Sequence, residues 1–311
     1  MLERVRTIVR QDTTAETAWL GRIFEAQFDS IRRHFLALDR DDQRIVEFTT
    51  AGEFVGYYGR RGEGPGETTN VSAFAAGTDH LTSLDVGNGK LMVFDRSTRE
   101  MQLEIKLDRR VRDVTAIGDT LVAVIPGEGG SLFEVFRIDG RSLGSFGSDG
   151  YLPPGRRHGP IMHAKDALLV LKPDIPEGRI YRLDGTLHAE ITFAEVASVL
   201  AEWREEFARL LRRANLVGPD GAPVMGGKNY VAPAGTAGNG SFLLSATPEN
   251  LDVNPWELWQ LDERGRVRQR YVFEDVWVRA FAASFPSIYA LGIGEEFGVY
   301  EYRIPQPADP R

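Results

Sequence analysis

Short apolar segments recur along the whole chain, and turns rich in glycine, proline and acidic residues separate them. One unit consists of an apolar strand, a polar loop, a second strand that often ends in an acid, a glycine turn and a third strand. The first unit spans residues 35–58 and the second spans residues 81–107. Segments of this length that are rich in β-branched and aromatic residues are typical of β-strands. The pattern therefore predicts an all-β protein built from repeats.

The units recur with a period that is typical of a four-stranded propeller blade. They begin at residues 35, 81, 121, 168, 242 and 288, and four of the five spacings lie between 40 and 47 residues. An apolar segment upstream of each unit supplies an innermost strand; these segments span residues 22–28, 71–75, 111–117, 160–165, 229–232 and 276–282. We therefore predict a single six-bladed β-propeller domain of four-stranded blades over residues 1–311.

The last unit lacks an outer strand, because it ends at Ile304 and three prolines, Pro305, Pro307 and Pro310, follow closely. Proline has no backbone N–H to donate to a strand ladder. The N-terminal segment Val5–Val9 has the strand pattern that is missing here. We predict that this N-terminal strand completes the last blade, since closure removes an exposed sheet edge.

The fifth unit begins 74 residues after the fourth, which leaves an insertion over residues 194–228. Its apolar residues have the spacing of one face of an α-helix; they are Val196, Val199, Leu200, Trp203, Phe207, Leu210, Leu211 and Ala214. The segment Gly218–Gly221 then begins a loop. We predict one inserted α-helix between blades four and five, which serves either as a lid over one face of the propeller or as a buttress at its side.

A glycine-rich motif, Gly-Arg-Arg-Gly-Glu-Gly-Pro-Gly-Glu, spans Gly59–Glu67 after the first unit. Either its glycines form a tight turn whose backbone hydrogen-bonds to Glu67, or its amides bind an anion. The motif resembles the Gly-Arg-x-Gly-x-Gly-Pro-Gly-Glu signature of a bacterial six-bladed propeller family, and the blade pattern is similar to that of NHL and TolB-like propellers. Many relatives are exported or lipid-anchored envelope proteins, so the resemblance implies a fold and an envelope or exported location, but no reaction.

Charge and composition argue against several classes of protein. The chain has 45 acidic and 37 basic side chains, a net charge of -8, which argues against a nucleic-acid partner. It has no cysteine, which excludes disulfides and thiolate metal sites. No apolar run reaches the roughly 18 residues of a membrane span. Met1–Arg6 does not resemble a secretory signal, so we expect a soluble chain whose export signal, if the resemblance holds, has been trimmed.

Paired arginines recur in three connections between the outer strand of one blade and the inner strand of the next. These connections share one face of a propeller, where converging guanidinium groups can bind a carboxylate or phosphate. The candidate ligand-binding residues are Arg60, Arg61, Arg109, Arg110, Arg112, Arg156, Arg157, His158, His163 and Arg279. Alternatively, the arginines form surface salt bridges with acids on loops of the same face, such as Asp39 and Asp42.

Polar residues on the predicted innermost strands suggest a second kind of site. Oxygen ligands from several blades can hold Ca²⁺ on the propeller axis, as they do in lactonase-type six-bladed propellers. The candidate metal ligands are Glu25, Asn70, Asp113 and Asn229. Alternatively, these side chains hydrogen-bond the exposed backbone of the innermost strands and water on the axis.

These observations leave three functional hypotheses. The leading one is a non-catalytic binding protein that takes a small anionic molecule, a peptide or a glycan on the face covered by the predicted helix. The alternative is a hydrolase, lyase or isomerase that acts on a small molecule at the end of the axis, with or without calcium. The third is a scaffold for protein assembly, because the propeller fold supports all three roles. The sequence leaves the oligomeric state open.

Overall fold

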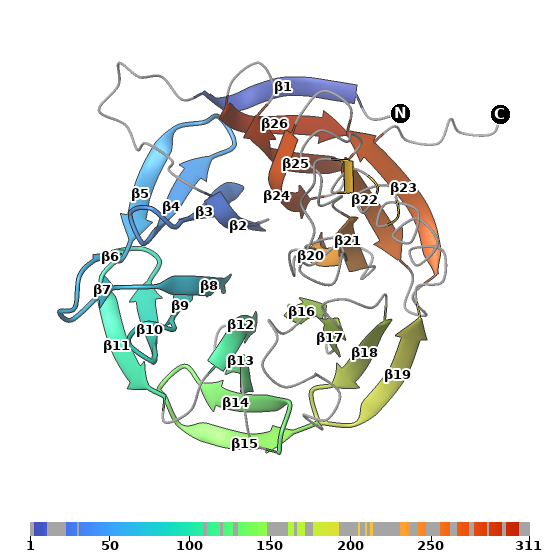
Figure 1. The fold of residues 1–311 in the computed structure, drawn as a ribbon. Coiled ribbons are helices and arrows are strands. Elements are labelled where there is room, and N and C mark those ends of the chain that lie inside the picture. Colours follow the sequence, from blue (N-terminus) through green and yellow to red (C-terminus); the bar gives the residue numbers. More distant parts are fainter. Residues whose placement is uncertain are drawn as a thin grey trace.

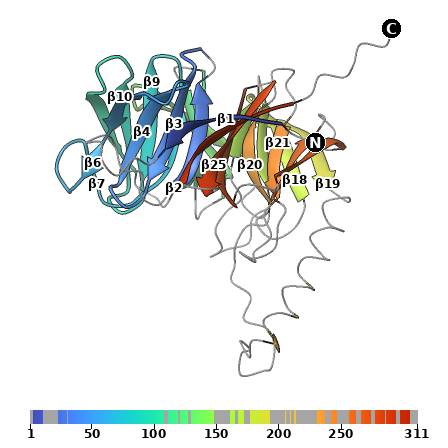
Figure 2. The same cartoon turned by 90° about the horizontal axis from the view of Figure 1, so that it is seen from above.

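The computed structural model describes residues 3–10, 23–29, 31–107, 111–118, 121–126, 130–147, 161–164, 167–171, 177–192, 205, 209, 212–213, 231–236, 242–246, 256–261, 266–273, 277–284, 286–293 and 297–304. Their strands form six four-stranded antiparallel sheets that stand around a central axis like the blades of a propeller (Figure 1). Seen from the side, the sheets form a disc (Figure 2). The prediction of an all-β protein with six blades is confirmed.

The strands of the first three blades follow one another from the axis to the rim in chain order. Blade 1 consists of β2 (Ile23–Asp29), β3 (His34–Asp39), β4 (Arg44–Thr49) and β5 (Phe54–Tyr58). Blade 2 consists of β8 (Val71–Ala76), β9 (His80–Asp85), β10 (Lys90–Asp95) and β11 (Met101–Lys106). Blade 3 consists of β12 (Val111–Ile117), β13 (Leu121–Pro126), β14 (Phe133–Arg137) and β15 (Ser142–Phe146). Between blades 1 and 2, β6 (Arg60–Arg61) and β7 (Glu67–Thr68) form a short parallel pair.

The remaining blades repeat this order, except for the outer strand of the last one. Blade 4 consists of β16 (Ile161–Ala164), β17 (Ala167–Leu171), β18 (Glu177–Arg182) and β19 (Leu187–Thr192). Blade 5 consists of β20 (Val231–Thr236), β21 (Phe242–Ala246), β22 (Trp256–Leu261) and β23 (Val267–Phe273). Blade 6 consists of β24 (Trp277–Ser284), β25 (Ser287–Ile293), β26 (Phe297–Arg303) and β1 (Glu3–Arg10).

The N-terminal strand closes the ring as the sequence predicts. β1 pairs antiparallel with β26, from Glu3 opposite Arg303 to Arg10 opposite Gly298. Figure 1 shows β1 on the outer side of β26, where blades 1 to 5 have their own fourth strand. Because the first and last strands share one sheet, the last blade has its full complement of four strands.

The core lies between neighbouring blades, because successive residues of a strand face opposite sides of its sheet. On β8, Phe74 packs against Leu36 and Tyr58 of blade 1, whereas Ala73 packs toward Val114 of blade 3. Each blade therefore needs two apolar faces. This explains why its strands read as nearly continuous apolar runs rather than as alternating ones.

The acid that ends the second strand of the repeat has a structural role. Asp95 Oδ1 accepts hydrogen bonds from the backbone amides of Ser97 and Thr98 at 2.7 and 2.8 Å. Asp139 and Asp184 take the corresponding places in blades 3 and 4 and accept from the amides two residues onward, at 3.0 and 2.9 Å. Such Asx turns end a strand and start the hairpin. The acid is therefore a turn residue in three successive blades.

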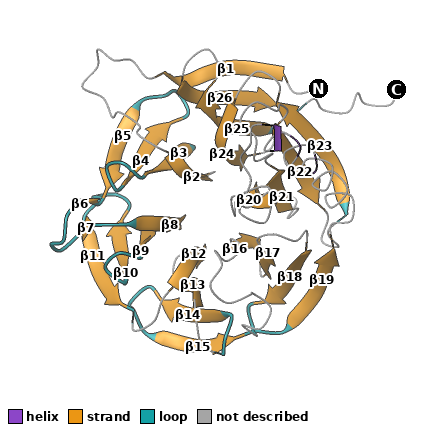
Figure 3. Ribbon diagram, in the orientation of Figure 1, coloured by secondary structure: helices purple, strands orange, loops and turns teal. Residues whose placement is uncertain are grey.

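The predicted inserted helix falls almost entirely outside the described residues. Within it, Glu205, Arg209, Arg212 and Arg213 are described and have helical conformation (Figure 3), and Arg209 Nη2 lies 4.0 Å from Glu205 Oε1. These four residues do not establish the helix over residues 194–214, which stays a prediction. Among the described helical residues there is no apolar helix long enough to cross a membrane.

Candidate binding site at one end of the propeller axis

Four innermost strands carry a β-bulge close to their first residue. The pairing with the second strand skips one residue between Ile23 and Glu25, Val71 and Ala73, Val111 and Asp113, and Val278 and Ala280. The skipped residues are Phe24, Ser72, Arg112 and Arg279. A bulge bends its strand and re-aims the neighbouring side chains, and bulges are common beside binding and active sites.

These bulges bring predicted anion-binding residues and predicted metal ligands to the same level of the propeller. Arg112 and Arg279 occupy the bulges of blades 3 and 6, which stand opposite each other in the ring. Glu25 and Asp113 directly follow the bulges of blades 1 and 3. These four residues, which we call the axial ring, therefore lie at equivalent backbone positions around one end of the axis.

Glu25 of the axial ring lies between the innermost strands of blades 1 and 2. Gln27 Nε2 donates to Glu25 Oε1 at 2.9 Å and to the carbonyl oxygen of Phe74 at 2.6 Å. Burial raises the pKa of Glu25 to about 8, and the negative charge of Asp113 adds to the rise, while hydrogen bonds from Gln27 and the Phe74 amide oppose it. The negative charge of Asp113, on blade 3, thus acts on Glu25 of blade 1.

Gln27 supports the alternative to a calcium site, in which polar side chains hydrogen-bond the exposed backbone of the innermost strands. Its Oε1 accepts from the backbone amide of Ala76 at 3.1 Å, while its Nε2 donates to the carbonyl oxygen of Phe74. One side chain thus pairs two backbone groups on the free edge of β8, as the burial of peptide groups requires. Gln27 was not among the predicted site residues, although its position two residues beyond Glu25 on the same strand is a usable signal.

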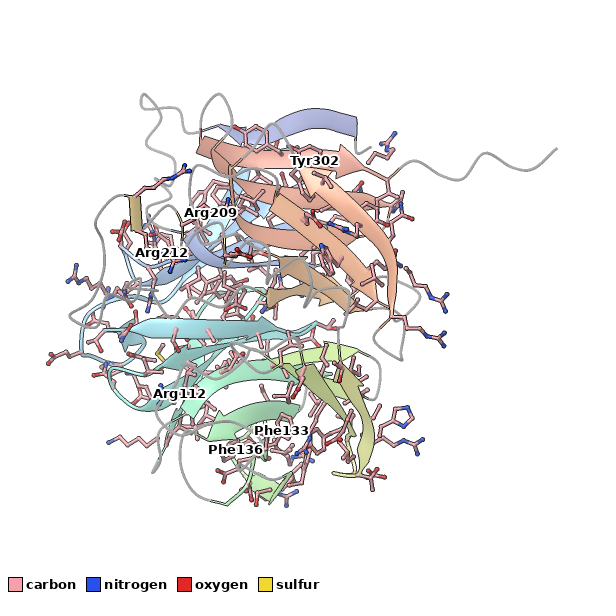
Figure 4. The ribbon with its side chains drawn as sticks, turned by 45° about the vertical axis from the view of Figure 1, so that its right-hand side comes forward. Arg112, Phe133, Phe136, Arg209, Arg212 and Tyr302 are labelled. Atoms are coloured by element: carbon pink, nitrogen blue, oxygen red, sulfur yellow. The ribbon has the colours of Figure 1, made fainter. Side chains whose placement is uncertain are left out.

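Arg112 has unused hydrogen-bonding capacity. Its side chain is half-buried, and its Nε is a buried donor with no hydrogen-bond partner among the described residues. Ser72 Oγ, on the equivalent bulge of blade 2, is also buried without a hydrogen-bond partner among the described residues. In Figure 4, Arg112 lies toward the same face of the ring as Arg209 and Arg212 of the insertion. A buried donor without a partner costs stability, which a ligand with an acceptor group would restore.

Asn70 lies just before β8, and its backbone is used to anchor that strand. Asp85 Oδ1 accepts from the amide of Asn70 at 3.0 Å, and Asp85 Oδ2 accepts from the amide of Thr69 at 2.9 Å. A Cβ added to Gly87 would lie 3.0 Å from the Cβ of Asn70, so Asn70 packs directly against the β9–β10 turn. This residue thus lies at the start of an innermost strand, as predicted, and against a turn.

The glycine-rich motif forms a tight turn at the rim. The amide of Gly64 donates to Glu67 Oε2 at 2.9 Å, and Gly59 and Gly66 have φ values of 73° and 72°, a left-handed conformation that favours glycine. Arg60 Nη2 lies 2.9 Å from Glu67 Oε1, and the Arg60 side chain is 73% exposed. The expected hydrogen bond from the turn backbone to Glu67 is confirmed.

The structure does not bring the first arginine pair together with Arg112. Arg60 and Arg61 form β6, which Figure 1 places at the outer edge of the ring, whereas Arg112 belongs to an innermost strand. The acids of the β3–β4 loop pair within their own blade, since Arg44 Nη2 lies 2.7 Å from Asp42 Oδ2. The salt bridges expected between these acids and the paired arginines are therefore not seen for Asp42.

Several predicted site residues lie outside the described part of the chain. These are Arg109, Arg110, Arg156, Arg157, His158 and Asn229, and only the backbone is described for His163 in β16 and Arg279 in β24. Among the described residues no group of three or more histidine, aspartate or glutamate side chains could hold a metal ion. Glu25 and Asp113 offer two carboxylates, whereas Ca²⁺ takes about six to eight oxygen ligands. The calcium site stays a prediction.

Comparisons with known proteins support the fold. Residues 14–122 match a family described as a 6-bladed beta-propeller. A protein of Bacteroides fragilis that is provisionally described as exported is similar over 98% of this chain and 96% of its own, at 13% identity and a TM-score of 0.62. A β-propeller domain from Myceliophteria thermophila is similar over 98% and 100% of the two chains, at 10% identity and a TM-score of 0.57.

A third solved structure is also similar to the chain. Hydrazine synthase of Kuenenia stuttgartiensis is similar over 91% of this chain and 76% of its own, at 11% identity and a TM-score of 0.53. No curated protein sequence matches the chain significantly. At these identities the likeness concerns the fold alone. The protein is thus a six-bladed β-propeller, and its function has to be inferred from the axial ring.

Proposed function

We propose that the protein is a non-catalytic binding propeller that takes a small anionic ligand at the axial ring. The observation that carries the proposal is the guanidinium group of Arg112, which stands on a bulge at the end of the axis with a buried Nε for which the described residues offer no acceptor. A guanidinium group offers a planar fork of donors that matches a carboxylate or phosphate. The ligand group can be part of a small molecule, a peptide or a glycan.

Hydrogen bonds to Arg112, rather than the net charge of the chain, favour anion binding here. A buried donor without a partner costs about 1–3 kcal/mol, and a charge-assisted hydrogen bond to an ionised acceptor recovers this cost. The chain as a whole carries a net charge of -8, so it repels anions at long range. Anion binding therefore requires a local cationic group with a defined geometry, and Arg112 supplies one.

The insertion over residues 194–228 extends the proposal. In Figure 4 its described residues Arg209 and Arg212 lie toward the same face as Arg112. Figure 2 shows the described residues of the insertion standing away from the disc on this side. We infer that the insertion is a lid that closes over the axial ring when a ligand binds. Long connections in a compact domain are often functional, which supports this role. Such a lid would exclude water from the ligand and strengthen its ionic contacts.

The experiment is calorimetric titration of the full chain with acetate, citrate and inorganic phosphate. Arg112→Gln should weaken the tightest of these interactions at least about tenfold, which corresponds to one lost charge-assisted hydrogen bond. The matched control is Arg268→Gln, because Arg268 is exposed on β23 at the rim. The control should bind as the wild type does. Equal losses in both variants, or no anion binding by the wild type, would contradict the proposal.

A second candidate function rests on the two carboxyl groups of the axial ring. Glu25 has a pKa raised to about 8 by burial and by the charge of Asp113, so one carboxyl group can hold a proton while the other is ionised. Such a pair can serve as general acid and general base in a hydrolase, lyase or isomerase. This enzyme hypothesis predicts turnover of a small molecule that Glu25→Gln abolishes while the variant stays folded.

A further inference from the structure

Blade 2 has an arginine at a backbone position where other blades have glycine. In blades 1, 3 and 4, the turn between the third and fourth strands contains a glycine with a φ of 87° or 88°; these are Gly52, Gly140 and Gly185. The amide of each donates to the carbonyl oxygen at the start of its turn, at 2.9 to 3.0 Å. In blade 2 the amide of Arg99 donates to the carbonyl oxygen of Asp95 at 2.8 Å, and Arg99 has a φ of 63°. This left-handed conformation is sterically unfavourable for a residue with a Cβ, so we expect the Arg99 side chain to have a use.

The side chain of Arg99 lies across the outer strand of blade 1. A Cβ added to Gly56 of β5 would be 2.4 Å from Arg99 Nε, so the glycine leaves the space that the arginine occupies. Arg99 Nε lies 3.8 Å from Glu47 Oε2, which is beyond hydrogen-bonding distance, and it is buried with no hydrogen-bond partner among the described residues. The side chain as a whole is 29% exposed, so part of it is open to solvent.

Glu47 already has closer partners than Arg99. Its Oε1 accepts from Arg96 Nη2 at 2.9 Å and lies 2.9 Å from His34 Nδ1, and its Oε2 accepts from the hydroxyl group of Tyr58 at 2.7 Å. Both oxygens of the carboxylate therefore make shorter contacts with other groups. The contact with Glu47 leaves the hydrogen-bonding capacity of Arg99 unused.

The buried network around Glu47 contains more arginines than carboxylates. Arg96 lies 2.6 Å from Asp29 Oδ2 and 2.9 Å from Glu47 Oε1, whereas Arg32 and Arg99 approach the same two carboxylates only at 3.4 and 3.8 Å. Three guanidinium groups thus share two carboxylates, which leaves one positive charge in excess. Arg99 has the longest of these contacts, so it is the arginine that an added anion would complement best.

The acids of the turn itself do not supply this negative charge. Asp95 Oδ1 accepts from the amides of Ser97 and Thr98 at 2.7 and 2.8 Å, and Asp95 Oδ2 accepts from Gln102 Nε2 at 3.1 Å. Among the described residues, no ion pair joins Arg99 to Asp95. The carboxylate of Asp95 therefore holds the turn together rather than neutralising the arginine.

Arg99 and the axial ring belong to opposite faces of the propeller. Arg112 stands near the first residue of β12, an innermost strand. Successive strands of a blade are antiparallel, so the chain leaves the third strand at the other face. Arg99 follows β10, which is the third strand of blade 2. A site at Arg99 is therefore separate from the one proposed at Arg112.

We propose that Arg99 binds an oxyanion, the carboxylate or phosphate group of a small molecule, between blades 1 and 2 on the face opposite the axial ring. The guanidinium group presents its donors in a planar fork, which matches two oxygens of such a group. The ligand supplies the negative charge that the network of three arginines and two carboxylates lacks. It also gives blade 2 a reason to keep an arginine where blades 1, 3 and 4 have glycine. The inference is independent of the function proposed for the axial ring.

The test is calorimetric titration of the full chain with inorganic phosphate and with acetate. Arg112→Gln serves as the parent, because it removes the anion site proposed for the axial ring. Adding Arg99→Gly restores the residue of the other blades and removes the guanidinium group. It should weaken the tighter of the two interactions at least about tenfold, the loss of one charge-assisted hydrogen bond. The matched control is Arg33→Gly, since Arg33 is exposed in the β2–β3 turn and also has a positive φ, of 58°. The control should bind as the parent does.

A second variant and a second readout separate binding from a structural role. Arg99→Gln keeps the left-handed backbone and removes the charge, and it should lose the same affinity as Arg99→Gly. The tighter-binding anion should raise the melting temperature of the parent and of the Arg33 control, but not that of either Arg99 variant. If both Arg99 variants bind as the parent does, or if the parent binds neither anion, the inference is wrong and Arg99 serves only as a distant partner of Glu47. Binding in the wild type that Arg112→Gln abolishes would leave the axial ring as the anion site and overturn this one.

Discussion

Blade 1 meets its two neighbours in different ways. Toward blade 6, across the closure of the ring, it packs aromatic side chains. Tyr289 of β25 stacks on Phe28 with ring centroids 4.8 Å apart, and it meets Phe35 edge-on at 4.4 Å. Ile23 and Val46 of blade 1 belong to the same apolar cluster. This closing interface is held by burial of apolar surface, which tolerates small changes in geometry.

Toward blade 2, blade 1 also packs apolar residues, but it adds a network of buried charges. Arg96, only 3% exposed, places Nη1 2.6 Å from Asp29 Oδ2 and Nη2 2.9 Å from Glu47 Oε1. Tyr58 donates to Glu47 Oε2 at 2.7 Å, and Arg96 Nη1 also donates to the carbonyl oxygen of Gly77 at 2.9 Å. We call Arg96, Asp29 and Glu47 the charged clasp.

The pKa values show that the clasp is electrostatically complementary. Burial alone would raise the pKa of Asp29, yet hydrogen bonds from the backbone of Arg32 and Ile31, together with the charge of Arg96, hold it below its usual value. For Glu47, burial is again outweighed, by hydrogen bonds from His34 and Tyr58 and by the charge of Arg96. The two interfaces therefore differ in how they respond to the loss of one side chain. Loss of one member of the clasp leaves a buried charge poorly paired, whereas loss of one ring from the aromatic cluster removes only part of the apolar contact.

The largest effect should follow from breaking the clasp at its centre. Arg96→Met removes the buried cation that Asp29 and Glu47 share and leaves them only the more exposed Arg32 and Arg99, at 3.4 and 3.8 Å. The free energy of unfolding should therefore fall by about 3–5 kcal/mol in chemical denaturation. Arg99→Met is the matched control, because Arg99 lies 3.8 Å from Glu47 but its side chain is 29% exposed. It should cost less than about 1 kcal/mol. Equal effects of the two substitutions would show that the clasp has no special role.

A smaller effect should appear when acid titrates the clasp. Asp29 and Glu47 have depressed pKa values in the folded chain, so their contribution to stability is present above their unfolded pKa values and is lost as pH falls through the folded ones. The wild type should therefore lose more stability than Arg96→Met between about pH 5 and pH 2. The difference between their free energies of unfolding should become smaller as the pH falls. A gap that stays constant over this range would contradict the account.

The smallest effect should come from the closing interface. Tyr289→Leu keeps an apolar side chain but removes the ring contacts with Phe28 and Phe35, so we expect a loss of about 1–2 kcal/mol in the free energy of unfolding. Because the described ring contacts are between uncharged aromatic side chains, this loss should vary little with pH between about 5 and 2. A loss larger than that of Arg96→Met would reverse the comparison between the two interfaces.

The blade architecture could be predicted from sequence because it depends on local patterns. The period of the units, the prolines after Ile304 and the strand pattern of Val5–Val9 predict six blades and their closure, and the pairing of β1 with β26 confirms the closure. The turn at Glu67 was also predictable, because glycines that adopt positive φ next to an acid form such turns. In each case the interacting residues belong to one repeat or to the chain ends.

Neither the charged clasp nor the arrangement of the candidate site could be predicted in the same way. The charged clasp joins residues that are 67 and 49 positions apart, and nothing in the repeat pattern pairs Arg96 with Asp29 or Glu47. The bulges at Arg112 and its equivalents come from strand register, which one extra residue changes without altering the apolar pattern of the blade. Likewise, a pair of arginines in such a connection need not reach the axis, as β6 (Arg60–Arg61) at the rim shows.

The most direct test of the axial ring as a binding site is a crystal structure of the full chain with whichever of acetate, citrate and phosphate binds most tightly. The proposed function predicts the carboxylate or phosphate group of the ligand within hydrogen-bonding distance of the Arg112 guanidinium group. A ligand seated at the rim beside Arg60 and Arg61, or an Arg112 that pairs with a carboxylate of its own chain while the axial ring is empty, would contradict it.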